Sequence, residues 1–171
     1  MKRLLLATLL LVLVSGLWAV EDNFTITVSV EYIEINLRTA DDSGDYGTWN
    51  IGGPVAAGSQ HTMTTGSGGD HILVDNNSSV SLDFSAYSSD ATTWTPGVAA
   101  GNETYLLEGG KGDVDTEPGA YTTFDDTSTP GDVYAAAEPA STDHHFYARL
   151  TVPTIVADGN THTITVNIVA E

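Results

Sequence analysis

The sequence contains no cysteine, and only 5 of its 171 residues are Lys or Arg, against 23 Asp and Glu. The absence of cysteine excludes disulfide bonds and thiolate-ligated zinc or iron–sulfur sites. A formal charge of −18 would repel phosphate backbones, so we expect no nucleic-acid partner. Amphipathic helical periodicity is also nearly absent after the first 19 residues, which argues against a helical fold.

The first 19 residues show the three-part pattern of a secretory signal peptide. Lys2 and Arg3 precede an apolar run over residues 4–14, and the small residues Ser15, Gly16 and Ala19 follow. The apolar stretch is at the short limit for a membrane span, and no second segment of spanning length follows. We therefore expect cleavage after Ala19 and a protein that is secreted or held at the cell surface, in an extracellular or periplasmic compartment.

Removal of residues 1–19 raises the charge density. The remaining 152 residues keep all 23 acidic groups and only three basic ones, Arg38, Lys111 and Arg149, which gives a formal charge of −20. Three cations cannot neutralise so many carboxylates, so dissolved cations must screen them. Close packing of several such chains would therefore depend on salt or divalent ions.

Residues 20–171 are predicted to form one all-β domain. Stretches of period two that are rich in Val, Ile, Thr and Tyr recur between Gly, Asn, Asp and Pro residues, as in a two-sheet β-sandwich of seven to nine strands, Ig-like or jelly-roll-like. The expected strands are residues 24–30, 60–64, 71–75, 80–84, 104–107, 132–136, 145–152 and 162–170. Long polar segments separate several of them, at residues 39–60, 87–102 and 108–139.

The last two expected strands are predicted to form a hairpin. Apolar residues alternate along 145–152 and again along 162–170, and the pair Asp158-Gly159 lies between them. Asp-Gly is a strong turn signal between alternating strands. We therefore expect these two strands to be neighbours in one sheet.

The clearest alternation is at the new N-terminus, where Phe24, Ile26, Val28 and Val30 are separated by Thr and Ser. The apolar phase then changes before Ile33, which indicates a bulge or a change of sheet. A strand freed at the N-terminus could add to an open sheet edge of a second copy and so polymerise the protein. The alternative is an ordinary first strand paired within its own domain.

Alternate carboxylates after residue 110 are the best candidates for metal ligands, namely Asp113, Asp115, Glu117, Asp125 and Asp126. Calcium takes six to eight oxygen ligands of this kind. The segment is not an EF-hand, because Pro118 and Phe124 occupy the positions of the required Gly and Glu. The alternative is a solvated acidic loop in a protein that is acidic throughout, so calcium is a candidate and no cofactor is assigned.

No motif for catalysis is present, and we expect a protein that is not an enzyme. The five histidines show no metal-ligand spacing and read as surface or strand-end residues. A nucleophile elbow of the form Gly-x-Ser-x-Gly is missing. Trp49 and Trp94 lie in or beside long polar segments, where exposed rings could stack on a polysaccharide. The alternative for both is a place in the core.

One segment resembles a known family. The sequence Pro54-Val-Ala-Ala-Gly-Ser59, followed by Ile72-Leu-Val-Asp-Asn76-Asn-Ser-Ser-Val80-Ser-Leu-Asp83, is similar to exported matrix-fibre subunits of the TasA/camelysin type. Pro54 and Gly58 are not adjacent here, which departs from the Pro-Gly turn of that pattern. The resemblance implies a jelly-roll-like subunit that polymerises by donating its N-terminal strand, and it transfers no catalytic residue.

Together these features predict an exported structural or adhesive protein of the cell surface, acidic and self-associating, that builds filaments or an extracellular matrix. A competing prediction is a non-catalytic module that binds carbohydrate or another surface ligand through its long loops.

Overall fold

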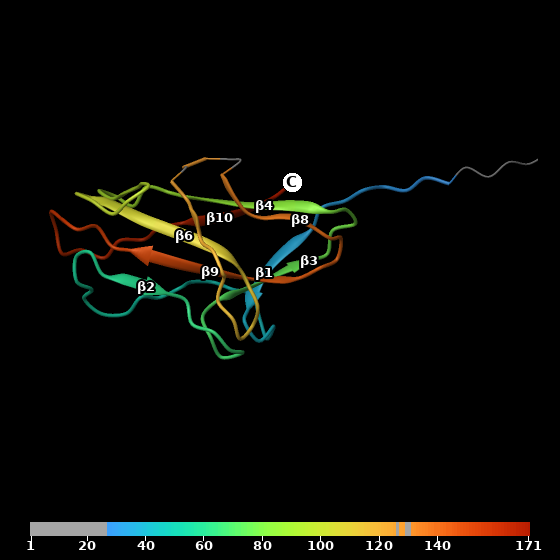
Figure 1. Cartoon of the computed structure of the whole chain (residues 1–171), viewed down its shortest axis with the longest axis horizontal. Helices are drawn as coiled ribbons and strands as arrows, with labels where there is room; N and C mark the ends of the chain where they lie inside the picture. Colours follow the sequence, from blue (N-terminus) through green and yellow to red (C-terminus); the bar gives the residue numbers. More distant parts are fainter. Residues whose placement is uncertain (1–26, 126, 129–130) are drawn as a thin grey trace, which may run out of the picture. The chain divides into compact units, whose positions relative to one another are not determined.

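Ten strands lie in the part of the chain that the computed structural model describes, which is residues 27–125, 127–128 and 131–171 (Figure 1). The chain divides into two units, residues 1–30 and residues 31–171, and all ten strands belong to the second. The strands are β1 (Ile35–Thr39), β2 (Gln60–Thr62), β3 (Ile72–Asn76), β4 (Leu82–Ser88), β5 (Thr95–Pro96), β6 (Thr104–Gly112), β7 (Thr122–Thr123), β8 (Asp132–Glu138), β9 (His144–Thr151) and β10 (Val166–Ala170).

The strands form two sheets, which confirms the all-β, two-sheet architecture. The larger sheet has the order β1-β3-β9-β6-β5, with β2 paired to β9 and β7 paired to β6, and it curls into a half-barrel. The smaller sheet has the order β10-β4-β8. In Figure 1, β4, β8 and β10 form the upper layer, and β9, β1, β2 and β3 lie below it.

The core lies between the two layers and follows from the alternation of the sequence. In β3, Ile72 and Val74 are buried, while the alternating residues Leu73 and Asp75 are partly exposed. A cluster of rings fills the centre, with Phe146 packed edge-on to Tyr134 and stacked on Phe124 at ring-centroid distances of 4.8 and 6.1 Å. Burial of these side chains is the main stabilising contribution in a domain without disulfides.

The predicted hairpin between residues 145–152 and 162–170 is wrong. β9 pairs with β2, β3 and β6 in the larger sheet, whereas β10 pairs with β4 in the smaller one. The connection between them carries the chain from one layer to the other, and regular pairing in the second strand begins only at Val166. Alternation shows that a segment is a strand, but it does not identify the partner.

Two further expectations differ from the structure. Residues 27–30, the described part of the expected strand 24–30, lie outside any strand. The polar segment 108–139 is not one long loop, because β6 continues to Gly112 and the short β7 lies within the segment. The other expected strands correspond to β2, β3, β4, β6, β8, β9 and β10 with shifted ends.

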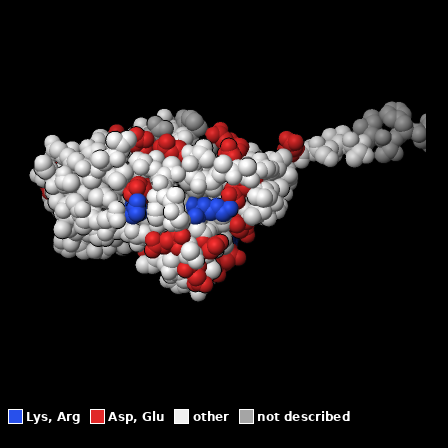
Figure 2. Space-filling model, viewed as in Figure 1, with Lys and Arg blue, Asp and Glu red and all other residues white. Residues whose placement is uncertain are grey.

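All three basic side chains of the described residues are paired inside the domain. Arg38 bonds to Asp42, Lys111 bonds to Glu138 at 2.6 and 2.7 Å, and Arg149 holds Glu108 through two hydrogen bonds of 2.8 and 2.9 Å. Figure 2 shows acidic side chains gathered around these few cations, while the left end of the domain in that view is largely uncharged. Most of the remaining carboxylates have no Lys or Arg partner, so dissolved cations must screen their charge.

Candidate functional site

An apolar groove lies between the inner face of the larger sheet and strand β10. Its volume is about 970 Å³. One wall comes from the larger sheet and from residues 46–57, and the other from residues 158–168. The main apolar side chains that line it are Leu37, Ile72, Phe146, Leu150, Ile164, Val166 and Ile168. A groove of this composition can accept a row of apolar side chains.

The groove is open because the smaller sheet is too narrow to cover the larger one. β10 is the outer strand of the smaller sheet and pairs only with β4 among the described strands. Every residue of β10 is only partly buried. The far edge of β10 therefore presents backbone N–H and C=O groups without a strand partner, which is the usual site for addition of a further strand.

Asp70 holds the loop that forms one wall of the groove. Its carboxylate accepts a hydrogen bond of 2.8 Å from the Trp49 indole, and its backbone carbonyl accepts one of 2.8 Å from the Tyr46 hydroxyl. The other carboxylate oxygen accepts hydrogen bonds from the backbone and hydroxyl of Thr64. Burial, with a smaller contribution from the Asp70 charge, raises the pKa of Tyr46 to about 12. These bonds fix the loop in place.

The residues of the predicted donor strand are only partly described. Phe24 and Ile26 lie outside the described residues. Val28 and Val30 are 76 % and 78 % exposed. Large apolar side chains exposed in alternation are available for contacts outside their own domain.

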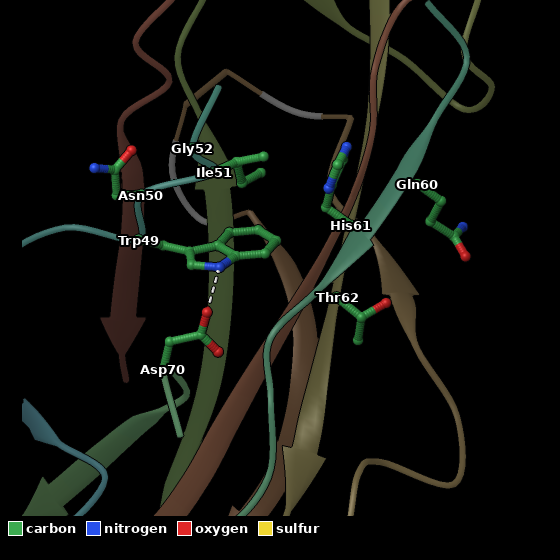
Figure 3. Close-up of a pocket in the computed structure, with 8 residues that line it drawn as sticks. All are labelled: Trp49, Asn50, Ile51, Gly52, Gln60, His61, Thr62 and Asp70. Carbon is green, nitrogen blue, oxygen red and sulfur yellow. Dashed lines mark hydrogen bonds between the residues drawn. The ribbon is translucent and has the colours of Figure 1, made fainter. Parts of the chain in front are cut away.

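A second, smaller pocket lies beside Trp49, with a volume of about 390 Å³ (Figure 3). Trp49, Gln60, His61 and Thr62 are among the residues that line it, and the side chains of Gln60 and Thr62 extend to the side of β2 away from Trp49. Trp49 is half-buried. Trp94 is buried in the core and stacks on His162. Both tryptophans line the larger groove, but only Trp49 also lines this smaller pocket.

The predicted calcium ligands that the structure describes lie in the turn after β6 and in the irregular segments on either side of β7. Asp113 and Thr116 close a tight turn through two backbone hydrogen bonds, with Asp115 inside it. Glu117 accepts a hydrogen bond of 3.2 Å from the Tyr121 hydroxyl. Within the described part of the chain, no three acidic or histidine side chains converge on a possible metal position. Asp125 is described but Asp126 is not, so the calcium site stays a prediction.

Two histidines are buried, which the sequence analysis missed. His71 and His144 lie at strand ends, as predicted, but they are 0 % and 3 % exposed. His144 shares the inward-facing phase of Phe146 two residues later, and that phase was the available signal. The Tyr134 hydroxyl lies 3.1 Å from its Nε2, and burial lowers the pKa of His144 to about 4.

The predicted signal segment, residues 1–19, lies outside the described residues. The described residues include no helix with the length and apolar character needed to cross a bilayer. No protein-family model matches the chain, and no curated protein matches it either.

Proposed function

We propose that this protein is an exported structural component of the cell surface or extracellular matrix. In this proposal its subunits form filaments when residues 24–30 of one copy add to the free edge of β10 in the next copy. The observation that carries the proposal is the open apolar groove beside an unpaired strand edge. An adhesive role would use the same assembly.

The dimensions of the two partners support this assembly. A seven-residue strand spans roughly 23 Å at about 3.3 Å per residue, and the five residues of β10 span roughly 16 Å. Phe24, Ile26, Val28 and Val30 would point to one side of the added strand and fill the groove. Thr and Ser would face outward. The added strand would complete an Ig-like or jelly-roll-like sandwich, as the resemblance to matrix-fibre subunits implies.

The charge of the protein sets a condition on assembly. Subunits with a formal charge of −20 after cleavage repel one another unless cations screen them. The groove is lined by one carboxylate, Asp158, among some thirty residues. Contact through the groove thus joins surfaces of low charge, and the acidic side chains stay outside the interface.

Deletion of residues 20–30 tests strand donation. We expect the deleted chain to remain a folded monomer, because no strand of the described domain includes these residues. Filaments seen by negative-stain microscopy for the chain that begins at Val20 should be absent in the deletion. Added peptide of residues 20–30 should shift the NMR signals of β10. Filaments that persist after deletion would contradict the proposal.

A matched pair of point variants controls for charge. Val28→Asp with Val30→Asp places two charges on the apolar side of the donor strand and should abolish filaments. Thr27→Asp with Ser29→Asp adds the same charge to the outward side and should leave them. Equal loss in both pairs would show that charge alone blocks assembly.

A second candidate function is binding of a neutral saccharide at the pocket beside Trp49. The observation that favours it is a half-buried indole held in position by Asp70. Tryptophan emission should shift when soluble oligosaccharides are added to the wild-type protein, because a sugar ring that stacks on the indole displaces water. The shift should be absent in Trp49→Phe. An identical shift in both proteins would exclude this pocket.

A further inference from the structure

His162 is held by three neighbours on the wall of the groove. Its ring stacks on Trp94 with a centroid distance of 4.0 Å and an angle of 13° between the planes. Its Nδ1 lies 3.2 Å from the carbonyl oxygen of Ala91, and its Nε2 lies 3.1 Å from Oδ1 of Asp158. The side chain is only 4 % exposed.

The two groups that hydrogen-bond to His162 can both act only as acceptors. A backbone carbonyl and a carboxylate can only accept hydrogen bonds, so each ring nitrogen must carry a proton for both bonds to form. The two hydrogen bonds can therefore form together only when the ring is doubly protonated. A cation stacked on an indole face gains a further attraction. A protonated ring would form an ion pair with Asp158 and a cation–π contact with Trp94 in this position.

The charged and titratable groups around this ring are few. Asp158 faces it from its own segment, and the Glu103 carboxylate accepts a hydrogen bond from the backbone of Ala157, the residue before Asp158. The segment that carries Ala91 and Trp94 also contains Asp90, which is exposed. Across the groove, the only titratable side chain of its lining is Tyr46. No second cation lines the groove to compete for Asp158.

The contacts of His162 fasten one wall of the groove. Residues 158–165 form this wall just before β10. At its far end, two hydrogen bonds of 2.9 and 3.0 Å join Thr165 to Ser89. Within residues 158–163, the hydrogen bond between His162 and Ala91 and the stack on Trp94 join the wall to the neighbouring segment.

We propose that His162 is a proton-dependent latch on the wall of the groove, and that loss of its proton releases residues 158–164 from the Ala91–Trp94 turn. Loss of one proton leaves a lone pair facing either the carbonyl or the carboxylate, so one hydrogen bond is replaced by repulsion. The charged ring stabilises the wall, so this contribution is present at low pH and is lost as the pH rises. The effect on assembly rests on the proposed function, because a donated strand would pack against this wall.

The latch can be tested in the monomer, at concentrations below assembly. In Trp49→Phe the remaining tryptophan of the chain that begins at Val20 is Trp94, whose emission a stacked imidazolium quenches. Emission should rise with pH from 5 to 10, and the rise should be absent in the additional variant His162→Gln. As a control, His61→Gln added to Trp49→Phe should leave the rise in emission unchanged. Emission that does not change with pH would overturn the proposal.

Two measurements on the wild-type protein do not depend on how the variants fold. Nitrogen-15 shifts of His162 at pH 6 should show both ring nitrogens protonated, and one unprotonated nitrogen would overturn the latch. Amide exchange of residues 159–164, corrected for its intrinsic pH dependence, should be about tenfold faster once the proton is lost, as expected for one lost hydrogen bond. Exchange that does not change would also overturn it.

Assembly gives a separate result. If the latch holds the wall that receives a donated strand, filaments should weaken over the pH range in which Trp94 emission rises. Filaments that are equally stable across that range would overturn the role of the latch in the groove. Absence of filaments at every pH, with the emission change intact, would count against the proposed function and leave the latch in the monomer supported.

Discussion

Replacement of Lys111 by methionine is expected to lower the free energy of unfolding by about 2 kcal/mol. Lys111 in β6 bonds both carboxylate oxygens of Glu138 in β8 and so joins the two sheets. The Glu138 side chain is 8 % exposed and that of Lys111 is 41 % exposed. Methionine removes the cation but leaves the carboxylate buried without its partner, and such a charge is costly. Urea denaturation at pH 7 measures the loss.

Because Glu138 is more buried than Lys111, removal of either partner should have a different effect, and this difference provides the controls. Glu138→Gln should cost about 1 kcal/mol, because the half-exposed ammonium of Lys111 can turn to water. The double variant Lys111→Met with Glu138→Met should recover most of the loss, because no charge then remains buried. Arg38→Met breaks an exposed ion pair and should leave stability almost unchanged, because water screens such pairs. A larger loss in Glu138→Gln than in Lys111→Met would contradict this account.

The sequence was sufficient to predict the fold class because strand alternation is a local property. The inward residues of β3 and β9 keep a period of two, and the buried set includes Ile72, Val74 and Phe146, as the pattern requires. Strand partners are not local. β9 and β10 both alternate and are separated by Asp158-Gly159, yet they lie in different sheets. The sheet in which a strand pairs depends on which strand edges the rest of the fold leaves available. The sequence of the strand itself does not contain that information.

The glycines of β6 show how packing can override a turn signal. Gly109, Gly110 and Gly112 resemble a loop in sequence, but they lie within a nine-residue strand. A Cβ on Gly109 would lie 2.5 Å from Phe124 and 2.6 Å from Phe146, and one on Gly110 would lie 2.6 Å from the carbonyl oxygen of Ala120. Neighbouring groups close over the backbone at these positions, so only glycine fits.

The candidate site depends even more on long-range structure. The proposed donor residues Val28 and Val30 are recognisable in sequence as an alternating apolar segment. The groove proposed to accept them is not, because its lining comes from segments as far apart as Leu37, Phe146 and Ile168. It exists because one sheet has fewer strands than the other. The buried His144 was predictable in principle from its phase with Phe146, but its polar character favoured a surface assignment.

His144 is expected to make the protein less stable as the pH falls from about 6.5 to about 4. Burial lowers its folded-state pKa from 6.5 to about 4, and the nearby Lys111 charge acts in the same direction while Glu138 opposes it. Between these two pKa values, His144 is protonated in the unfolded chain but not in the folded chain, so a lower pH favours unfolding. The full shift corresponds to about 3 kcal/mol at 1.36 kcal/mol per pKa unit. Below pH 4 both states are protonated and the dependence ends.

Comparison with a variant isolates this contribution from that of the carboxylates. Relief of their mutual repulsion on acidification raises stability, which opposes the histidine effect. The free energies of unfolding of wild type and His144→Phe should be measured by urea denaturation at several pH values from 7.5 to 4. Wild type should lose about 3 kcal/mol relative to the variant over this range. The loss of the contact with Tyr134 lowers the stability of the variant by the same amount at every pH, so it does not affect the change with pH. His61→Asn, at a partly exposed histidine, should run parallel to wild type. Parallel curves for His144→Phe and wild type would show that burial of His144 does not govern the acid response.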